Sequence, residues 1–245
     1  MLPNLHPDAF LRNRMLLGED ACARLAASHV AVLGLGGVGG YAAEALARAG
    51  VGALTLADHD AVGATNLNRQ MCALHSTLGM PKAEATLARV LDVNPALRAR
   101  ALVLRYSAET REAFFDTRYD YVIDAIDLVT HKLDVIATAQ ARGVPIVSAL
   151  GTGNKFDPAL LRITDIEKTK ICPLARVVRK ELRYRGIRHH MVLWSPEEPR
   201  SPDPLEAPPE GRRSVPASVP WVPACAGFML AGFVVMSLAG HVNED

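Results

Sequence analysis

Short apolar runs alternate with longer segments of helical periodicity through the first two thirds of the chain. Apolar runs that end near glycine or aspartate predict strands, and segments with apolar residues three and four positions apart predict helices. The predicted strands are His29–Leu33, Ala53–Ala57, Ala101–Leu104, Tyr119–Ile123 and Pro145–Ala149. The predicted helices are Val38–Ala49, Pro81–Val93 and His131–Arg142. This alternation is typical of βαβ units, so we expect an α/β, Rossmann-like fold with a mainly parallel sheet and flanking helices.

The pattern changes after residue 165. The segment Glu167–His190 carries eight lysines or arginines against two glutamates, and it predicts a basic helix. Residues 195–223 contain nine of the sixteen prolines, which neither a regular helix nor a central strand accommodates, so they predict an extended loop. We therefore expect a Rossmann-like domain in residues 1–165 and a C-terminal extension in residues 166–245 that packs on the same domain.

An apolar helix is expected at residues 224–240, near the end of this extension. The stretch Pro223–Gly240 holds eighteen residues without a charge, which reaches the lower limit for a membrane span. It is rich in alanine and glycine, however, and no basic anchor flanks it. We expect a helix buried in the core or at a dimer interface, with membrane association as the less favoured alternative.

The composition adds a few constraints. A chain of 245 residues with 49% hydrophobic and 22% charged residues is ordinary for a globular protein, and its formal charge of +1 means that any nucleic-acid surface must be local. The four cysteines lie far apart and form no C-x-x-C pair, so we expect neither a structural zinc site nor a disulfide framework. The first ten residues lack the apolar region of a signal peptide, and a cytoplasmic location is expected.

The glycines after the first predicted strand fit the pattern G-x-G-x-x-G. Gly34, Gly36 and Gly39 match it, and Gly37 adds a fourth position without a side chain. A turn of this kind lets phosphates approach backbone amides at the positive end of a helix. Asp58 follows the second predicted strand, where a carboxylate can accept hydrogen bonds from two ribose hydroxyls. A chance glycine turn and a helix-capping aspartate are the alternatives.

Two cations and two amides follow at short distances. Asn66, Arg69 and Gln70 lie in the segment TNLNRQ, and Lys82 begins the next predicted helix. Backbone amides usually bind the pyrophosphate of NAD, whereas a triphosphate needs neutralising charges such as a bidentate arginine and a lysine. The set therefore favours ATP over NAD, although each cation alone would be interpreted as a solvated surface residue.

The segment DAID, after the fourth predicted strand, offers the carboxylates of Asp124 and Asp127. Mg²⁺ prefers oxygen ligands and is commonly shared between one or two carboxylates and the phosphates of a nucleotide. One of the two aspartates is therefore expected to hold Mg²⁺, and a helix cap is the alternative for Asp124.

Taken in order, these motifs resemble a known superfamily. GLGGVGG, LADHD, TNLNRQ, PKAEA and DAID, over about residues 11–165, are similar to the ThiF/MoeB/HesA superfamily, which has the fold of the ubiquitin-like-protein activating enzymes. The resemblance implies that ATP is the nucleotide and that a carboxylate is adenylated with loss of pyrophosphate. It also implies contacts to nucleotide, ribose, phosphates and Mg²⁺ by Gly37, Asp58, Asn66, Arg69, Lys82 and Asp127.

An N-terminal arginine belongs to the same resemblance. Arg14, in LRNRMLL, matches a residue that reaches into the site of the partner subunit in that superfamily. The resemblance therefore implies a homodimer, with Arg14 as a catalytic residue acting across the interface.

The rest of the chain resembles one branch, the tRNA threonylcarbamoyladenosine dehydratases. The similarity lies in GTGNKFDPALLRITDIEKTKICPLARVVRKEL, VLWSPEEP and VPACAGFMLAG. It implies ATP-dependent dehydration of N6-threonylcarbamoyladenosine beside the tRNA anticodon, by adenylation of the carboxylate and intramolecular ring closure. The alternative is an adenylyltransferase for a ubiquitin-like sulfur-carrier protein, which usually has two C-x-x-C zinc pairs. A cysteine desulfurase of a sulfur relay is a further candidate partner.

The basic segment favours a tRNA-binding surface. Its phosphate contacts would add salt-dependent affinity without base specificity. Arg176, Arg179, Lys180 and Arg183 recur at three- and four-residue spacing, so they share one face of the predicted helix. The alternative to a tRNA-binding surface is a solvated amphipathic helix. The candidates are Lys155, which lies near the expected substrate entrance, and Lys168, Arg176, Arg179, Lys180 and Arg183.

Overall fold

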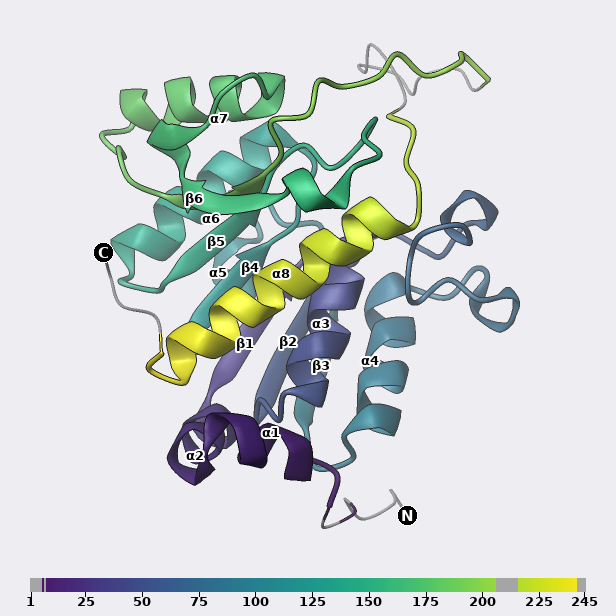
Figure 1. Ribbon diagram of the computed structural model, residues 1–245, viewed down its shortest axis with the longest axis vertical. Helices are drawn as coiled ribbons and strands as arrows, with labels where there is room; N and C mark the ends of the chain where they lie inside the picture. The colour runs from purple at the N-terminus through teal and green to yellow at the C-terminus, as the bar shows by residue number, and fades with distance from the viewer. Residues whose placement is uncertain (1–5, 7, 206–215, 242–245) are drawn as a thin grey trace.

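A seven-stranded sheet runs through the middle of the molecule, and helices cover both of its faces (Figure 1). The structure is a computed structural model that describes residues 6, 8–205 and 216–241. The strand order is β3-β2-β1-β4-β5-β7-β6, and every neighbouring pair is parallel except β6 with β7. The strands are β1 His29–Leu33, β2 Ala53–Asp58, β3 Arg98–Val103, β4 Tyr121–Asp124, β5 Ile146–Ala149, β6 Arg162–Asp165 and β7 Met191–Trp194.

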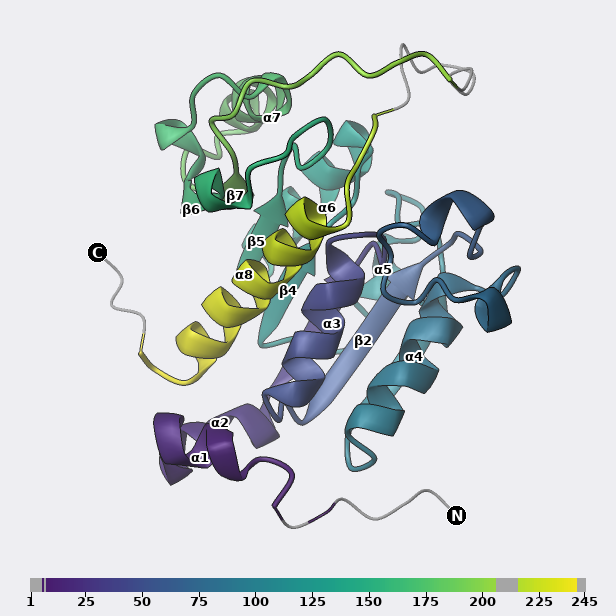
Figure 2. The same ribbon diagram turned by 45° about the vertical axis from the view of Figure 1, so that its right-hand side comes forward.

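Two hydrophobic clusters fill the space between the sheet and its helices. One lies under α3, α4 and α8, which run side by side in Figures 1 and 2, and includes Leu46, Leu54 and Leu230. The other lies under α5, α6 and α7 and includes Leu133 and Val178. The helices are α1 Leu11–Leu17, α2 Glu19–Ala27, α3 Gly39–Arg48, α4 Lys82–Val93, α5 Arg111–Phe114, α6 Val129–Ala141, α7 Pro173–Tyr184 and α8 Trp221–Leu238, with short 3₁₀ turns η1 Ala64–Asn66, η2 His75–Thr77, η3 Pro158–Leu160 and η4 Ile166–Lys168.

The predicted α/β fold is confirmed, and each of the five predicted strands overlaps a strand of the sheet. The strands β6 and β7 were not predicted, because each has only four residues and two of the four in β6 are charged, which gives little periodic signal. Since β7 pairs with β5, the sheet continues beyond residue 165, where the extension was expected to begin. Residues 206–215 of the expected proline-rich loop lie outside the described residues.

The apolar segment near the C-terminus forms α8, which packs lengthwise on α3. Gly227 marks the closest approach, because a Cβ added there would lie 2.4 Å from the Val38 carbonyl oxygen and 2.9 Å from Tyr41 Cβ. Around it, Ala226 and Leu230 are fully buried. By length and composition α8 is also capable of crossing a membrane, and 44% of it is buried in this structure.

Gly227 therefore sets the distance between α8 and α3, and a larger side chain should force them apart. Overpacking a core contact typically costs about 1–3 kcal/mol, so we expect Gly227→Leu to lower Tm by roughly 5 °C or more. Gly232 is the matched control, because its added Cβ would have no atom within 4 Å. Gly232→Ala should leave Tm unchanged or raise it, since alanine favours a helix interior. Equal melting temperatures for Gly227→Leu and the wild type would contradict this packing.

Candidate functional site

A cavity of about 1530 Å³ opens at the carboxyl ends of β1, β2 and β4. In open parallel sheets, ligands bind at this edge where the strand order reverses, which here lies between β1 and β4. The cavity brings together most of the predicted site residues. Its lining includes Gly34, Gly36, Gly37, Asp58, Asn66, Arg69, Gln70, Lys82 and Asp127.

The glycine turn after β1 requires glycine for steric reasons. Gly34 has a φ of +89°, and a Cβ there would lie 2.8 Å from the Ala125 carbonyl oxygen. A Cβ on Gly39 would come within 1.8 Å of the Gly34 carbonyl oxygen, so this buried residue lets α3 begin directly after the turn. Gly36 and Gly37 line the cavity, where their backbone can approach a ligand.

Asp58 joins the end of β2 to the glycine turn. Its buried carboxylate accepts hydrogen bonds from the backbone amides of Leu35 at 2.6 Å and Asp60 at 2.8 Å. Because these bonds fix both carboxylate oxygens at the cavity wall, the remaining lone pairs are held in place to accept ligand hydroxyls.

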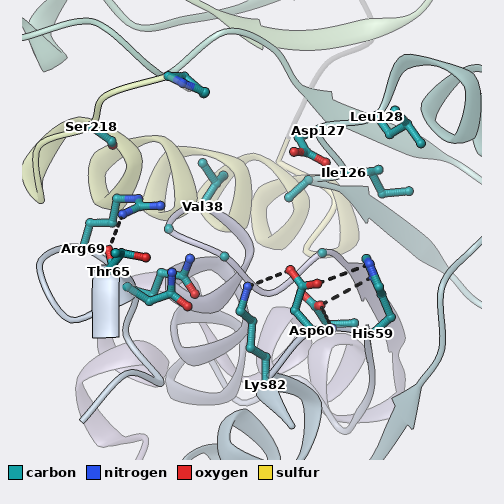
Figure 3. A pocket seen from close by; sticks show the side chains of 18 of the residues that line it. Val38, His59, Asp60, Thr65, Arg69, Lys82, Ile126, Asp127, Leu128 and Ser218 are labelled. Atoms are coloured by element: carbon teal, nitrogen blue, oxygen red, sulfur yellow. Dashed lines mark hydrogen bonds and ion pairs between the residues drawn. The ribbon is translucent and has the colours of Figure 1, made fainter. Parts of the chain in front are cut away.

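Lys82 begins α4 beneath the cavity, and its side chain is nearly buried (Figure 3). Its Nζ donates to Asp60 Oδ2 at 2.9 Å. Partial burial raises the pKa of the Asp60 carboxyl, but the bond and charge of Lys82 outweigh burial and leave this pKa below its usual value.

His59 Nε2 lies 3.2 Å from Asp60 Oδ1 and 3.0 Å from Arg105 Nη2. Asp60, His59 and Arg105 were not predicted, although the D-x-D spacing after Asp58 was a usable signal.

Arg69 and Gln70 follow η1 along another wall. Arg69 Nη1 donates to the Thr65 carbonyl oxygen at 2.8 Å and to Asn68 Oδ1 at 2.9 Å, and burial lowers the pKa of its guanidinium. The buried Gln70 Oε1 has no hydrogen-bond partner among the residues that the structure describes. Asn66 Oδ1 accepts the Gly63 amide at 3.0 Å and closes the loop. The loop thus presents a guanidinium whose position is fixed by two bonds.

The structure separates the two aspartates of DAID. Asp124 is fully buried and forms a 2.6 Å ion pair with the fully buried Lys132, while its other oxygen accepts the Ile126 amide at 2.9 Å. Asp127 is exposed and lines the cavity (Figure 3). Asp127 is therefore the carboxylate of the pair that a ligand in the cavity can reach.

A buried histidine lies close to the same ion pair. His190 Nε2 is 2.8 Å from Ser148 Oγ. Burial and then the charge of Lys132 lower the pKa of His190 to about 3, so its ring is neutral at physiological pH. The ion pair and the imidazole form a polar core beneath the loop that carries Asp127.

Several predicted residues lie outside the cavity lining: Gly39, Arg14, Lys155 and the predicted tRNA-binding residues of η4 and α7. Arg14 is on α1, 3.7 Å from Glu19 Oε1, and does not line the cavity. Lys155 is buried and donates to the Ser195 carbonyl oxygen at 2.8 Å, and burial lowers the pKa of its amine. Lys155 therefore does not present its charge to solvent beside α7.

The basic helix α7 carries a small surface pocket of about 350 Å³, lined by Arg176, Arg179, Lys180, Arg183 and Tyr184. Arg176 and Lys180 are exposed, whereas Arg179 donates to the Thr169 carbonyl oxygen at 2.9 Å. Arg183 pairs with Glu167. Lys168 is exposed on the adjacent η4. Arg176, Lys180 and Lys168 are therefore the cations that this face presents most directly to solvent, while Arg179 keeps its charge because its bonds are to neutral oxygens.

The different surroundings of Asp124 and Asp127 predict different effects on stability. Asp124→Asn leaves the Lys132 ammonium buried without its counter-ion, which typically costs about 3–5 kcal/mol. Asp127→Asn should cost less than about 1 kcal/mol, because its side chain is exposed. Urea denaturation of both variants and the wild type measures the difference, and similar losses in both variants would contradict this assignment.

The chain is similar to known proteins over nearly all of its length. The chain matches the model of the ThiF family over residues 10–241. It is 43% identical over 243 residues to the tRNA threonylcarbamoyladenosine dehydratase of Bacillus subtilis (strain 168), with 96% of each chain covered. A crystal structure of the Escherichia coli tRNA N6-threonylcarbamoyladenosine dehydratase in complex with ATP is similar with a TM-score of 0.87 and 32% identity, over 98% of this chain and 97% of that chain.

The similarity to sulfur-carrier enzymes is less extensive. The sulfur carrier protein ThiS adenylyltransferase of Escherichia coli (strain K12) is 36% identical over 136 residues, which is 55% of this chain and 53% of that protein. The similarity to the dehydratases includes β6, β7, α7 and α8 as well as the cavity. This chain belongs to the ThiF family, on the branch of the tRNA threonylcarbamoyladenosine dehydratases.

Proposed function

We propose that this chain catalyses the ATP-dependent dehydration of N6-threonylcarbamoyladenosine in tRNA, beside the anticodon. The observation that carries this function is one cavity in which the glycine turn, Asp58, Arg69, Lys82 and Asp127 meet, in a chain similar over 96% of its length to a dehydratase of that substrate.

The reaction follows from the chemistry of the carboxylate. One oxygen of the threonylcarbamoyl carboxylate attacks the α-phosphorus of ATP, and the bond to pyrophosphate breaks. The carbamoyl nitrogen or oxygen then attacks the activated carbonyl carbon, a proton is lost, and AMP leaves with the former carboxylate oxygen. The product has therefore lost the elements of water. Because the attack is intramolecular, the effective concentration of the attacking carbamoyl group is high.

The predicted site residues of the cavity have distinct roles in this scheme. Asp58 would accept the ribose hydroxyls, and the backbone amides of the glycine turn would approach the phosphates. Arg69 and Lys82 would neutralise the charge that develops as pyrophosphate leaves. Gln70 would accept a hydrogen bond from the ligand, since its buried Oε1 has no partner within the described part of the chain.

A magnesium ion fits the donor groups of this cavity. The exposed carboxylate of Asp127 lines the same space as the cations that would bind phosphate, and Mg²⁺ commonly joins one or two carboxylates to phosphate oxygens. Asp127 would hold the ion, which when bound would polarise the phosphates.

Several features of the assembly are part of the proposal. Arg14 lies on α1 outside the cavity of its own subunit, which supports a homodimer in which it reaches the partner's site. The four cysteines are free thiols, and a cysteine desulfurase is a candidate partner. We expect α8 to contribute to the core or the dimer interface rather than to cross a membrane, and the protein to act in the cytoplasm.

Substitutions of Arg69 and Asp127 give a direct test of the proposed chemistry. Arg69→Ala and Asp127→Ala should lower the rate of pyrophosphate release by about 10²–10³-fold, as loss of a transition-state contact typically does. Arg98→Ala and Asp92→Ala are controls, because these exposed residues lie outside the cavity lining. The assay compares threonylcarbamoylated tRNA, the unmodified tRNA and a ubiquitin-like carrier protein. Full activity of both the Arg69→Ala and Asp127→Ala variants, or pyrophosphate release with the carrier protein alone, would contradict the proposed function.

The α7 face gives a second prediction, on tRNA affinity. If Arg176 and Lys180 contact phosphates, changing both to glutamine should weaken tRNA binding. The slope of log K against log salt should also become less negative, by about 1–2. Arg98→Gln is the matched control, because β3 lies at the opposite edge of the sheet from β6. Binding isotherms at several salt concentrations measure the slope, and an unchanged slope in the double variant would exclude α7 as the phosphate-binding surface.

A further inference from the structure

Two proline-containing segments form part of the cavity wall that sequence motifs did not identify. Pro202–Leu205, here the outer limb, and Pro216–Ser218, the inner limb, both line it. Sites for a single small molecule typically occupy about 300–1,000 Å³. The volume of about 1530 Å³ therefore leaves space beside a nucleotide.

The space beside the inner limb lies at one end of the cavity. Figure 3 shows Ser218 above Arg69 and Thr65, whereas His59 and Leu128 lie toward the other end. Asn68 Nδ2 donates to the Ser218 carbonyl oxygen at 3.0 Å, so the inner limb is tied to the loop that carries Arg69.

Asn154 holds both limbs. Its amide donates to the Ala217 carbonyl oxygen at 2.8 Å, and its Oδ1 accepts the Ala217 amide at 2.7 Å. Its own carbonyl oxygen accepts the Arg200 amide at 2.8 Å, just before the outer limb. One residue therefore sets the position of two chain segments that are distant in sequence.

The backbone of Asn154 is adapted to this position. Its φ is +60°, in the left-handed region that asparagine tolerates better than most other residues. Neighbouring contacts hold the loop that carries Asn154. Glu197 accepts hydrogen bonds from the amides of Phe156 and Asp157 at 2.9 and 3.0 Å. Trp221 Nε1 donates to the Phe156 carbonyl oxygen at 2.7 Å. The loop after β5 thus anchors both limbs and the start of α8.

The chemistry of the limbs differs from that of the cavity floor. Pro202, Pro204, Leu205, Pro216 and Ala217 offer apolar surface, and prolines have no amide proton to give a phosphate. Asp203 adds a negative charge that disfavours phosphate, whereas Lys82 lies on the floor. The limbs therefore suit an uncharged ring and a hydrocarbon group better than a phosphate chain.

We propose that the two limbs form a subsite for the modified nucleoside, and that Asn154 is the positioning residue of this subsite. This inference rests on the proposed function. The ligand is a purine nucleoside of RNA with an acyl group that ends in a carboxylate. The limbs bind its base and the hydrocarbon part of its acyl group, the carboxylate extends away from Asp203 toward the cavity floor, and the phosphate backbone of the RNA is bound elsewhere.

Two substitutions separate the side chain of Asn154 from its backbone conformation. Asn154→Gly keeps access to a positive φ but removes the acceptor for the Ala217 amide. Asn154→Asp keeps an acceptor at the same place. We expect Asn154→Gly to raise the KM for threonylcarbamoylated tRNA about three- to tenfold, the range of one lost hydrogen bond, with the Kd for ATP unchanged. Asn154→Asp should stay within about twofold of the wild type for both constants.

Asn68→Ala removes the independent bond to Ser218 and should also raise the KM for the tRNA. Gln140→Ala is the control, since Gln140 makes a comparable bond to the His189 carbonyl oxygen away from the cavity. An unchanged KM for the tRNA in Asn154→Gly, or an equal change in the Kd for ATP, would overturn the subsite. The proposed function is judged separately, by whether the wild type releases pyrophosphate with the modified tRNA.

Discussion

The close contact between the glycine turn after β1 and the chain that leaves β4 sets the geometry of the whole site. Since a Cβ on Gly34 would lie 2.8 Å from the Ala125 carbonyl oxygen, the two segments touch through their backbones alone. The Ala125 amide also donates to the Leu33 carbonyl oxygen at 2.8 Å. Asp58 then binds the Leu35 amide, so the ends of β1, β2 and β4 are held as one unit. These contacts therefore fix the positions of the residues that would bind the nucleotide.

A buried ion pair supports the same edge of the sheet from below. Asp124 and Lys132 are both fully enclosed, and pairing such groups seldom adds net stability compared with apolar residues. Their value here is positional: Asp124 holds the Ile126 amide, and the next residue is Asp127. The buried His190 stays neutral beside this pair and adds no second positive charge. The interior therefore determines which aspartate faces the cavity.

Local periodicity predicted the fold because β1, β2, β4 and β5 are short, mainly apolar and followed by a helix or a polar turn. The spacing of the glycines, Asp58, Arg69 and Lys82 likewise predicted the residues that line the cavity. The residues alone left the choice between Asp124 and Asp127 open, and only the family resemblance indicated Asp127. The choice depends on tertiary structure, because Lys132 of α6 pairs with Asp124.

Other features depend on contacts between segments that are far apart in the chain. Lys155 is a cation in the sequence, but it is enclosed by the backbone around Ser195. Arg179 has the spacing of an exposed residue, yet it turns to Thr169. Asn154 lies in the segment GTGNK, but the sequence assigned it no role, because its role comes from its hydrogen bonds to Ala217 and Arg200. Such roles arise only when tertiary structure brings the partners into contact.

The bond between Lys82 and Asp60 has a consequence for the energetics of nucleotide binding. The nearly buried ammonium already has a carboxylate partner at 2.9 Å before any phosphate arrives. If Lys82 binds a triphosphate as proposed, the phosphate would replace Asp60 as its counter-ion. The net gain in binding free energy from Lys82 would then be the difference between two ion pairs, and Asp60 would pair with the lysine again when pyrophosphate leaves.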